Sequence, residues 1–274
     1  MKLGPLTSDR LSLLSMSQTN TQVPHLFECW NQISERIRAA KDIRIFLDFD
    51  GTLVPFCPEP DDVKLPEAAR RVLKKLATHS RVHVALVSGR RNAALRKYIR
   101  IPKIQLLGLY GWEKKGGLVL PARTRRALPS LRSVVKSVPA EFPGIRFEDK
   151  GVSFGIHFRG APSETIHRAR AWTRKLLVRV RKDFRVIQTS SAWEIVPRQV
   201  EGKGAALREF VKSLRRPFLP IYIGDDLTDE PAFSALRRGI TIRVGSGVPT
   251  MAHFWLKDPE EVRIFLERLT ESIA

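Results

Sequence analysis

The apolar positions of this chain follow two different patterns, and the change between them predicts its organisation. Residues 43–47 form a nearly continuous apolar run, typical of a parallel strand that is buried on both faces. Strands and helices then alternate as follows: a helix at 66–78 with Pro66 in its first turn, a strand at 82–87, a helix at 92–99 and a strand at 105–109. This alternation indicates a parallel α/β sheet.

A different module begins after Trp112. A turn at 114–117 and a helix at about 127–138 precede a hairpin of strands 145–149 and 152–159, whose second strand alternates apolar and polar residues. A helix at about 163–182 and strands at 185–188 and 193–196 complete the module. The pattern predicts an antiparallel sheet with one apolar face, and the helices pack on one face of this sheet.

The βα pattern resumes at Lys203. The predicted elements are a helix to Leu214, a strand at 220–223, a helix after Thr228 and a strand at 240–244. The second module therefore interrupts one α/β domain, and we expect it to lie as a cap over the carboxyl ends of the parallel strands, where open α/β sheets bind ligands. The predicted division is a lead-in segment at 1–41 with a helix at about 26–39, a core at 42–113 and 199–274, and a cap at 114–198.

Composition narrows the class of protein. The 274 residues are 43% hydrophobic, enough for a sizeable core. Cys29 and Cys57 cannot form a disulfide framework, and no Cys/His cluster has the spacing of a zinc site, so we expect a cytoplasmic protein. Polar and charged residues interrupt the first 40 positions, which argues against a signal peptide or a membrane span.

The formal net charge of +20 would by itself favour a polyanionic partner. Much of this charge follows helical segments, notably residues 168–182, where basic residues flank an apolar stripe. A solvated helix face is the interpretation we favour, and we see no aromatic-interleaved basic patch of the kind that binds nucleic acid.

Two carboxylates end the first buried strand. Asp48 and Asp50 flank Phe49, and side-chain alternation directs both carboxylates to the same side. A buried carboxylate requires a partner, and a bound cation would supply one. The alternative is that these acids cap a following turn.

The strand at 220–223 ends in Asp225, Asp226, Asp229 and Glu230, four acids within six residues of a basic chain. Asp225 and Asp229 are placed to converge on a hard cation such as Mg²⁺, with Thr228 as the N-cap of the next helix. A loop with ordinary capping is the alternative.

Two further segments carry groups that suit a phosphoryl oxygen. Ser88, Gly89 and Arg90 follow the strand at 82–87 and supply a hydroxyl, a small residue and a cation. Lys203 lies between Gly202 and Gly204, which would let its ammonium approach a phosphate closely, although an ordinary surface lysine is the alternative.

Four segments of the chain resemble the four motifs of haloacid dehalogenase (HAD) superfamily phosphatases and follow one another in the same order. They are Asp48-Phe49-Asp50-Gly51-Thr52, Ser88, Lys203 and Asp225-Asp226. The resemblance implies a HAD-like Rossmannoid core with a type C2B α+β cap, and a phosphatase that forms an aspartyl phosphate. It also implies Asp48 as nucleophile, Asp50 as general acid/base, and Ser88 and Lys203 as phosphoryl-holding residues. The implied Mg²⁺ ligands are Asp48, Asp50, Asp225 and Asp229. These roles fit phosphoryl transfer, which depends on positioning and charge neutralisation.

The cap region is similar to that of trehalose-phosphatases, and this resemblance covers about residues 42–270. The matching segments are Glu148-Asp149-Lys150, His157-Phe158-Arg159 and Glu194-Ile195-Val196-Pro197. The resemblance implies trehalose 6-phosphate as substrate, in trehalose biosynthesis with a functional link to a trehalose-phosphate synthase. It assigns the substrate-binding roles to Gly89, Arg90, Glu148, Lys150, His157, Arg159 and Glu194. Tyr110 stands where the family usually has His, a departure at a position that contacts sugar.

Two other functions remain open from the sequence. One is a phosphatase of the same architecture acting on another sugar phosphate, such as sucrose phosphate or mannosyl-phosphoglycerate, because cap residues determine that choice. The other is a non-enzymatic protein that binds polyanions through its positive charge.

Overall fold

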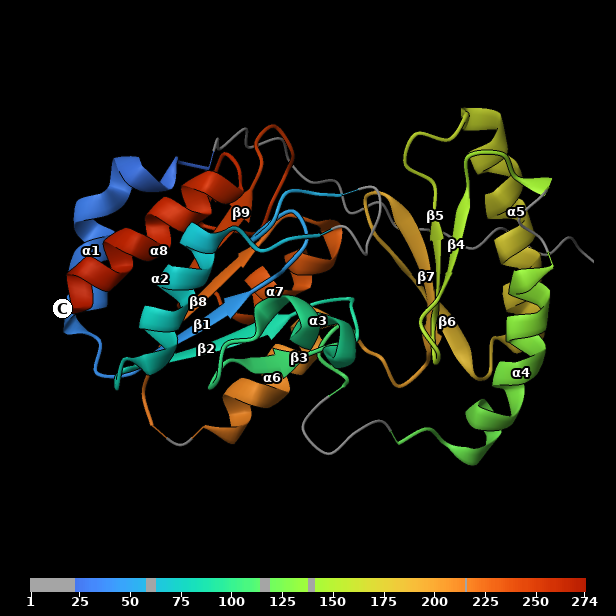
Figure 1. Cartoon of the computed structure of the whole chain (residues 1–274), viewed down its shortest axis with the longest axis horizontal. Helices are drawn as coiled ribbons and strands as arrows, with labels where there is room; N and C mark the ends of the chain where they lie inside the picture. The colour runs from blue at the N-terminus through green and yellow to red at the C-terminus, as the bar shows by residue number, and fades with distance from the viewer. Residues whose placement is uncertain (1–22, 58–62, 114–118, 138–140, 215) are drawn as a thin grey trace, which may run out of the picture.

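The computed structural model describes residues 23–57, 63–113, 119–137, 141–214 and 216–274. Within these ranges the chain forms two sheets that lie side by side, each covered by helices (Figure 1). No helix in the described ranges is long and apolar enough to cross a membrane. The predicted turn at 114–117 lies outside the described residues.

The first sheet is parallel and has the strand order β10-β9-β8-β1-β2-β3. Its strands are β1 (Ile43–Leu47), β2 (Val82–Val87), β3 (Gln105–Leu107), β8 (Leu219–Gly224), β9 (Ile240–Val244) and β10 (Phe254–Leu256). The central strand β1 pairs with β2 on one side and with β8 on the other, so segments far apart in sequence meet at the middle of the sheet.

Helices cover both faces of this sheet. One face packs against α1 (Trp30–Ala39), α2 (Glu67–Thr78), α3 (Asn92–Ile99) and α8 (Pro259–Ile273); the other packs against α6 (Lys203–Ser213) and α7 (Glu230–Ala235). Strand alternation sends Ile45 to the first face and Phe46 to the second. Because both faces are covered, β1 is apolar throughout except for Arg44.

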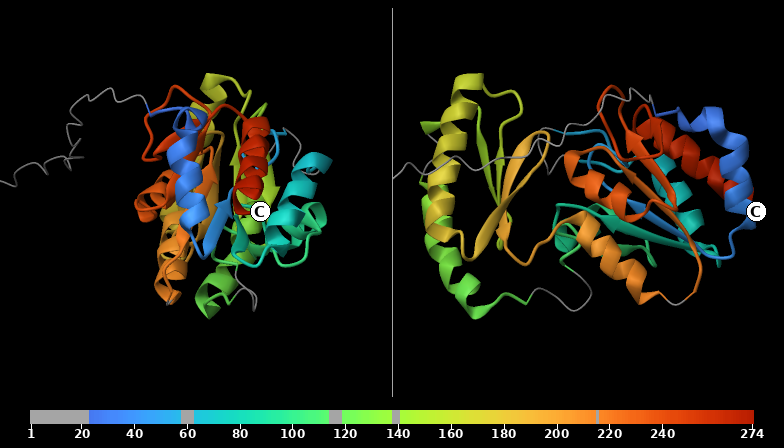
Figure 2. Two further views of the ribbon diagram at one scale, coloured as in Figure 1. Left: turned by 90° about the vertical axis from the view of Figure 1, so that its left-hand side faces the viewer. Right: turned by 180° about the vertical axis from the view of Figure 1, so that it is seen from behind.

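The second sheet is antiparallel, with the order β4-β5-β7-β6. Its strands are β4 (Arg146–Asp149), β5 (Phe154–His157), β6 (Phe184–Gln188) and β7 (Ala192–Pro197). The helices α4 (Ala122–Lys136) and α5 (Ser163–Val180) pack on the side of this sheet that faces away from the parallel sheet (Figures 1 and 2). The α/β class with an added α+β module is confirmed, and the domain boundaries stay a prediction.

Several predicted elements differ from the structure. The strand predicted at 105–109 ends at Leu107, because Leu109 and Tyr110 have positive φ angles of 48° and 60° that do not continue a strand. The helix predicted from residue 127 begins at Ala122 and continues through Pro129, a residue type that usually ends or kinks a helix. The helix predicted at 26–39 begins with a 3₁₀ turn at Leu26–Cys29.

The predicted N-cap at Thr228 is wrong. Asp226 is the N-cap of the 3₁₀ turn Leu227–Asp229: its side chain accepts from the Thr228 amide, and the Asp229 carboxylate accepts from the Asp226 amide at 2.9 Å. Asp226 has the extended backbone typical of an N-cap residue, and its carboxylate supplies the acceptor that was expected from Thr228.

Candidate active site

The carboxyl end of β1 places Asp48 beneath a cavity between the two sheets. Asp48 is only 5% exposed, and its amide donates to the Ile223 carbonyl of β8 at 2.9 Å. Gly51 follows with a φ of +79°, and a Cβ there would overlap the Asp225 carboxylate. The turn after β1 therefore requires glycine for two reasons, its left-handed backbone and the close approach of Asp225.

Lys203, the first residue of α6, bridges two carboxylates. Its Nζ lies 3.0 Å from Asp48 Oδ2 and 2.7 Å from Asp229 Oδ1, and the side chain is 3% exposed. Burial opposes the ammonium charge, but the two carboxylates outweigh it and raise the pKa of Lys203 above its usual range. Lys203 is thus a fixed cation beside Asp48 rather than a surface lysine.

Three acids converge at this point. Carboxylate oxygens of Asp48, Asp225 and Asp229 lie within 4.8 Å of one another. Burial, together with neighbouring acids, raises the pKa of Asp48 well above its usual range despite Lys203, and burial with Asp229 raises the pKa of Asp225 to about 7. Two buried carboxylates, the half-buried carboxylate of Asp225 and one ammonium leave an excess of negative charge, which fits a hard divalent cation with oxygen ligands.

Asp229 is fully buried and fixed from two sides. Tyr222 Oη donates to its Oδ1 at 2.5 Å, and a Cβ on Gly224 would overlap its carboxylate. The fourth acid of the segment, Glu230, accepts from Arg243, Thr250 and the Met251 amide, so it holds a loop rather than joining the cluster.

Asp50 does not join the three-acid cluster. Its carboxylate accepts from Arg90 Nε and Nη2, each at 2.7 Å, and the Arg90 guanidinium lies over the rings of Phe49 and Tyr98. Asp50 and Arg90 therefore form a bidentate pair beside the Asp48 carboxylate. The predicted roles of Asp50 as metal ligand and of Arg90 as substrate contact stay predictions.

Ser88 and Gly89 form the loop that follows β2 and directly precedes Arg90. Ser88 is 1% exposed, and its Oγ accepts from the Arg90 amide at 3.1 Å. A Cβ on Gly89 would lie 2.9 Å from Tyr110 Cζ, closer than ordinary packing allows, so the loop fits only a glycine against that ring.

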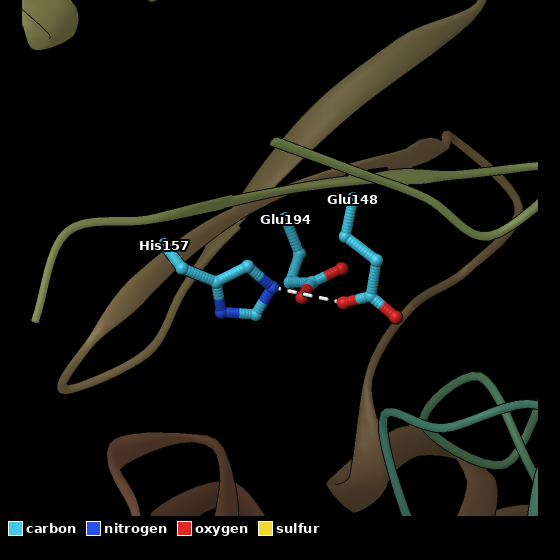
Figure 3. Close-up of side chains that lie close together, drawn as sticks. All are labelled: Glu148, His157 and Glu194. Atoms are coloured by element: carbon cyan, nitrogen blue, oxygen red, sulfur yellow. Dashed lines mark hydrogen bonds and ion pairs between the residues drawn. The ribbon is translucent and has the colours of Figure 1, made fainter. Parts of the chain in front are cut away.

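The antiparallel sheet contributes a second polar cluster on the opposite wall (Figure 3). His157 Nε2 lies 2.8 Å from Glu148 Oε2, the contact dashed in Figure 3. Lys150 Nζ lies 2.7 Å from Glu194 Oε1 and 3.7 Å from Glu148 Oε2. Burial opposes ionisation of Glu148, but His157 and Lys150 outweigh it and lower the pKa of Glu148 to about 2. Glu194 is 3% exposed, and its Oε2 has no hydrogen-bond partner among the described residues.

Two contacts join the cavity wall formed by the parallel-sheet part to the wall formed by the antiparallel sheet. Asp226 Oδ1 accepts from the Ser190 amide at 2.8 Å, and the Arg159 guanidinium lies 3.6 Å from the ring centroid of Phe56. Burial opposes ionisation of Asp226, yet the hydrogen bonds from Ser190 lower its pKa below the usual value. The first contact therefore joins an ionised carboxylate of the parallel-sheet part to the backbone of the other part.

The structure brings the predicted site residues together. All of them except the fully buried Asp229 line this one cavity: Asp48, Asp50, Ser88, Gly89, Arg90, Glu148, Lys150, His157, Arg159, Glu194, Lys203 and Asp225. Phe56 and Arg146 also line it and were not predicted. Arg146 lies two residues before Glu148 on one strand face, so strand alternation could have identified it, whereas no pattern marks Phe56.

The arrangement provides a buried carboxylate, a fixed ammonium, a candidate divalent-cation site and, across the cavity, groups able to hydrogen-bond hydroxyls. The first three suit attack on a phosphate ester, because they offset the repulsion between carboxylates and a phosphate dianion. The opposite wall suits a polar, hydroxyl-rich leaving group.

Comparisons with known proteins point the same way. The sequence model of the family described as trehalose-phosphatase matches residues 46–258. Trehalose-phosphate phosphatase B of Arabidopsis thaliana is 33% identical over 266 residues, covering 88% of this chain and 70% of the relative. Trehalose-6-phosphate phosphatase of Escherichia coli (strain K12) is 31% identical over 236 residues, covering 83% and 86%.

Solved structures share the fold. The C-terminal domain of Candida albicans trehalose-6-phosphate phosphatase superposes with a TM-score of 0.79 at 21% identity, over 92% of this chain and all of that one. The sucrose-phosphatase of Synechocystis superposes with a TM-score of 0.54 at 16% identity, over 85% and 98%.

Proposed function

This chain belongs to the trehalose-phosphatase family, and from that premise we propose that it hydrolyses trehalose 6-phosphate to trehalose and phosphate. The observation that carries the proposal is the two-walled cavity, in which Asp48 and Lys203 face the Glu148–Lys150–His157–Glu194 cluster. The first wall suits the phosphoryl group and the second suits the disaccharide.

In the first half-reaction, an Asp48 carboxylate oxygen attacks phosphorus and the bond from phosphorus to the sugar oxygen breaks. Asp50, in its protonated form and released from the pair with Arg90, gives its proton to the departing sugar oxygen. Lys203 holds Asp48 in place and offsets the charge of the incoming phosphoryl oxygens.

In the second half-reaction, water attacks phosphorus of the aspartyl phosphate while Asp50 accepts a proton from it. The phosphorus–Asp48 bond breaks, which releases phosphate and restores the carboxylate. Ser88 lies beside Asp48 in the cavity wall, and its hydroxyl is suited to donate to a phosphoryl oxygen throughout.

Asp48, Asp225 and Asp229 would hold Mg²⁺. When bound, the cation neutralises charge on the phosphoryl group. Across the cavity, the unpartnered Oε2 of Glu194 and the ammonium of Lys150 are suited to sugar hydroxyls, because one accepts and the other donates. The link to a trehalose-phosphate synthase and the cytoplasmic location stay predictions.

Phosphate release from trehalose 6-phosphate tests the proposal when it is compared with release from sucrose 6-phosphate, mannosyl-phosphoglycerate and an aryl phosphate. We expect the highest kcat/KM with trehalose 6-phosphate. A higher value with another sugar phosphate would replace the substrate assignment, and no release from any of the four would overturn the phosphatase itself.

A further inference from the structure

Tyr110 lies in a strained segment at the edge of the cavity. Its amide donates to the Ser88 carbonyl at 2.8 Å, directly after β2. Both Leu109 and Tyr110 adopt the left-handed backbone region, with φ of 48° and 60°, which is unfavourable for residues other than glycine. Strain of this kind persists only where the surrounding structure enforces it, and it concentrates at functional sites.

The ring of Tyr110 is held from two directions. It packs with Trp112, Ile187, Val196 and Val200, which join the two walls of the cavity. Its hydroxyl end lies against Gly89, since a Cβ on Gly89 would be 3.0 Å from Tyr110 Oη. The hydroxyl is therefore placed over the Ser88–Gly89 loop.

The Tyr110 hydroxyl makes no hydrogen bond to any described residue, although the side chain is only 4% exposed and lines the cavity. Tyr222, by comparison, is fully buried and donates to Asp229, so a buried tyrosine of this protein can find a partner. Burial first, and then the carboxylates of Glu194 and Asp226, raise the pKa of Tyr110 well above 10. The hydroxyl stays protonated and remains a donor.

We propose that Tyr110 is a phosphoryl-binding residue, whose hydroxyl donates a hydrogen bond to a phosphoryl oxygen of the substrate. The inference deepens the proposed function and rests on it, because the phosphoryl group is placed by Asp48, Ser88 and Lys203. A phosphoryl group offers only acceptors, and it would lie beside the Ser88–Gly89 loop that the hydroxyl covers. Unlike a lysine, tyrosine donates without adding charge to the site.

The test is Tyr110→Phe, which keeps the ring and removes the hydroxyl. We expect kcat/KM to fall roughly ten- to a hundredfold with trehalose 6-phosphate and by the same factor with an aryl phosphate, as for loss of one hydrogen bond to a charged acceptor. The inhibition constant of inorganic phosphate should rise by a similar factor, and the thermal midpoint should stay near that of the wild type. Unchanged kinetics, or a loss confined to the sugar substrate, would overturn the proposal.

Trp112→Phe is the matched control, because Trp112 packs in the same apolar cluster but does not line the cavity. It should leave both substrates and phosphate inhibition near wild-type values; if it reproduces the loss, Tyr110 acts through packing and the proposal fails. The wild-type rate on trehalose 6-phosphate tests the proposed function separately. If that rate is absent, the aryl phosphate and inorganic phosphate measurements still decide the role of Tyr110.

Discussion

Single residues in this protein carry charges that would be unfavourable alone. Lys203 is buried between Asp48 and Asp229, and Glu148 is held between His157 and Lys150. Removing one member of such a group leaves the others desolvated and unpaired, which is costly in a low-dielectric site. The outcome of a substitution therefore depends on which charge is left without a partner.

Asp48→Asn should abolish turnover, because an amide cannot attack phosphorus. It also removes one of three crowded carboxylates, so we expect the free energy of unfolding to stay equal or rise. Steady-state phosphate release and denaturant unfolding check the two parts. Appreciable turnover by the purified variant would exclude Asp48 as the nucleophile.

Glu148 should make stability depend on pH at acid values. Its pKa is about 2 in the folded protein against an ordinary value of 4.5, so its contribution is present above pH 4.5 and is lost as the pH falls through 2. Glu148→Gln should remove on the order of 2 kcal/mol of that dependence. Denaturant unfolding at pH 6, 4 and 3 measures it, with exposed Glu164→Gln as control; parallel pH profiles for Glu148→Gln and wild type would contradict the assignment.

At the scale of elements, side-chain alternation along the strands directs the functional groups into the cavity. Glycines leave room for these groups to pack against the backbone. On β5, Gly155 lies opposite Glu194 of β7 and Glu148 of β4. A Cβ on Gly155 would lie 2.7 Å from His157 Nε2 and 3.1 Å from Glu194 Oε1. The polar cluster therefore rests directly on the backbone of the strand, and its geometry depends on the absence of one methyl group.

Gly155→Ala should displace His157 and Glu194 while leaving Asp48, Ser88 and Lys203 in place. We expect kcat/KM for trehalose 6-phosphate to fall roughly tenfold or more, and that for an aryl phosphate to change little. Gly160→Ala is a useful comparison, since a Cβ there meets nothing within 4 Å, although its φ of +78° adds backbone strain. Equal losses on both substrates would show that the strand affects folding or closure rather than recognition.

Elements with strong local signals were predicted well. The strand at 43–47 and the helix at 92–99 were placed at their observed ends, because a continuous apolar run or an apolar stripe is a local property. The predicted elements lack α8, although Asp258 followed by Pro259 and Glu260 carries the N-terminal signature of this helix. The sequence could have revealed that helix.

Features that arise from tertiary structure could not be predicted in this way. The positive φ angles that end β3 early occur at Leu109 and Tyr110, and the Arg90–Asp50 pair joins the loops that follow β2 and β1. Likewise, the contact of Phe56 with Arg159 forms only when both sheets are in place. The sequence motifs predicted the candidate reactive residues, whereas only the fold shows which of these residues pair with each other.

At the scale of the whole molecule, charge is distributed unevenly. The helices α4 and α5 together hold ten Lys or Arg residues and one acid, and they lie on the side of the antiparallel sheet away from the parallel sheet (Figure 1). The cavity, in contrast, is lined by six acids and five Lys or Arg residues, and Asp48, Asp225 and Asp226 lie together at its acidic end. The overall positive charge therefore does not describe the site, which should attract cations to its acidic end.

Mg²⁺ should be required for activity and should also stabilise the protein. Chelation with EDTA should eliminate phosphate release, Mg²⁺ should restore it, and Ca²⁺ should restore it poorly because its larger coordination shell suits the site less well. Mg²⁺ at a hundredfold excess over its dissociation constant should add about 2.7 kcal/mol to the free energy of unfolding. Asp225→Ala should lose both effects; full activity after exhaustive chelation would contradict the metal site.

The order of strands in the parallel sheet has a consequence for how the protein is made. On the ribosome β2 emerges soon after β1, but β8, the other neighbour of β1, is synthesised only after the entire antiparallel module. Until α6 and the segment after β8 have been made, Asp48 lacks Lys203 and Asp229, and one edge of the hydrophobic central strand stays unpaired. The antiparallel module can fold during that interval, whereas the parallel sheet closes last through contacts distant in sequence, which makes folding slow and the nascent chain dependent on protection from aggregation.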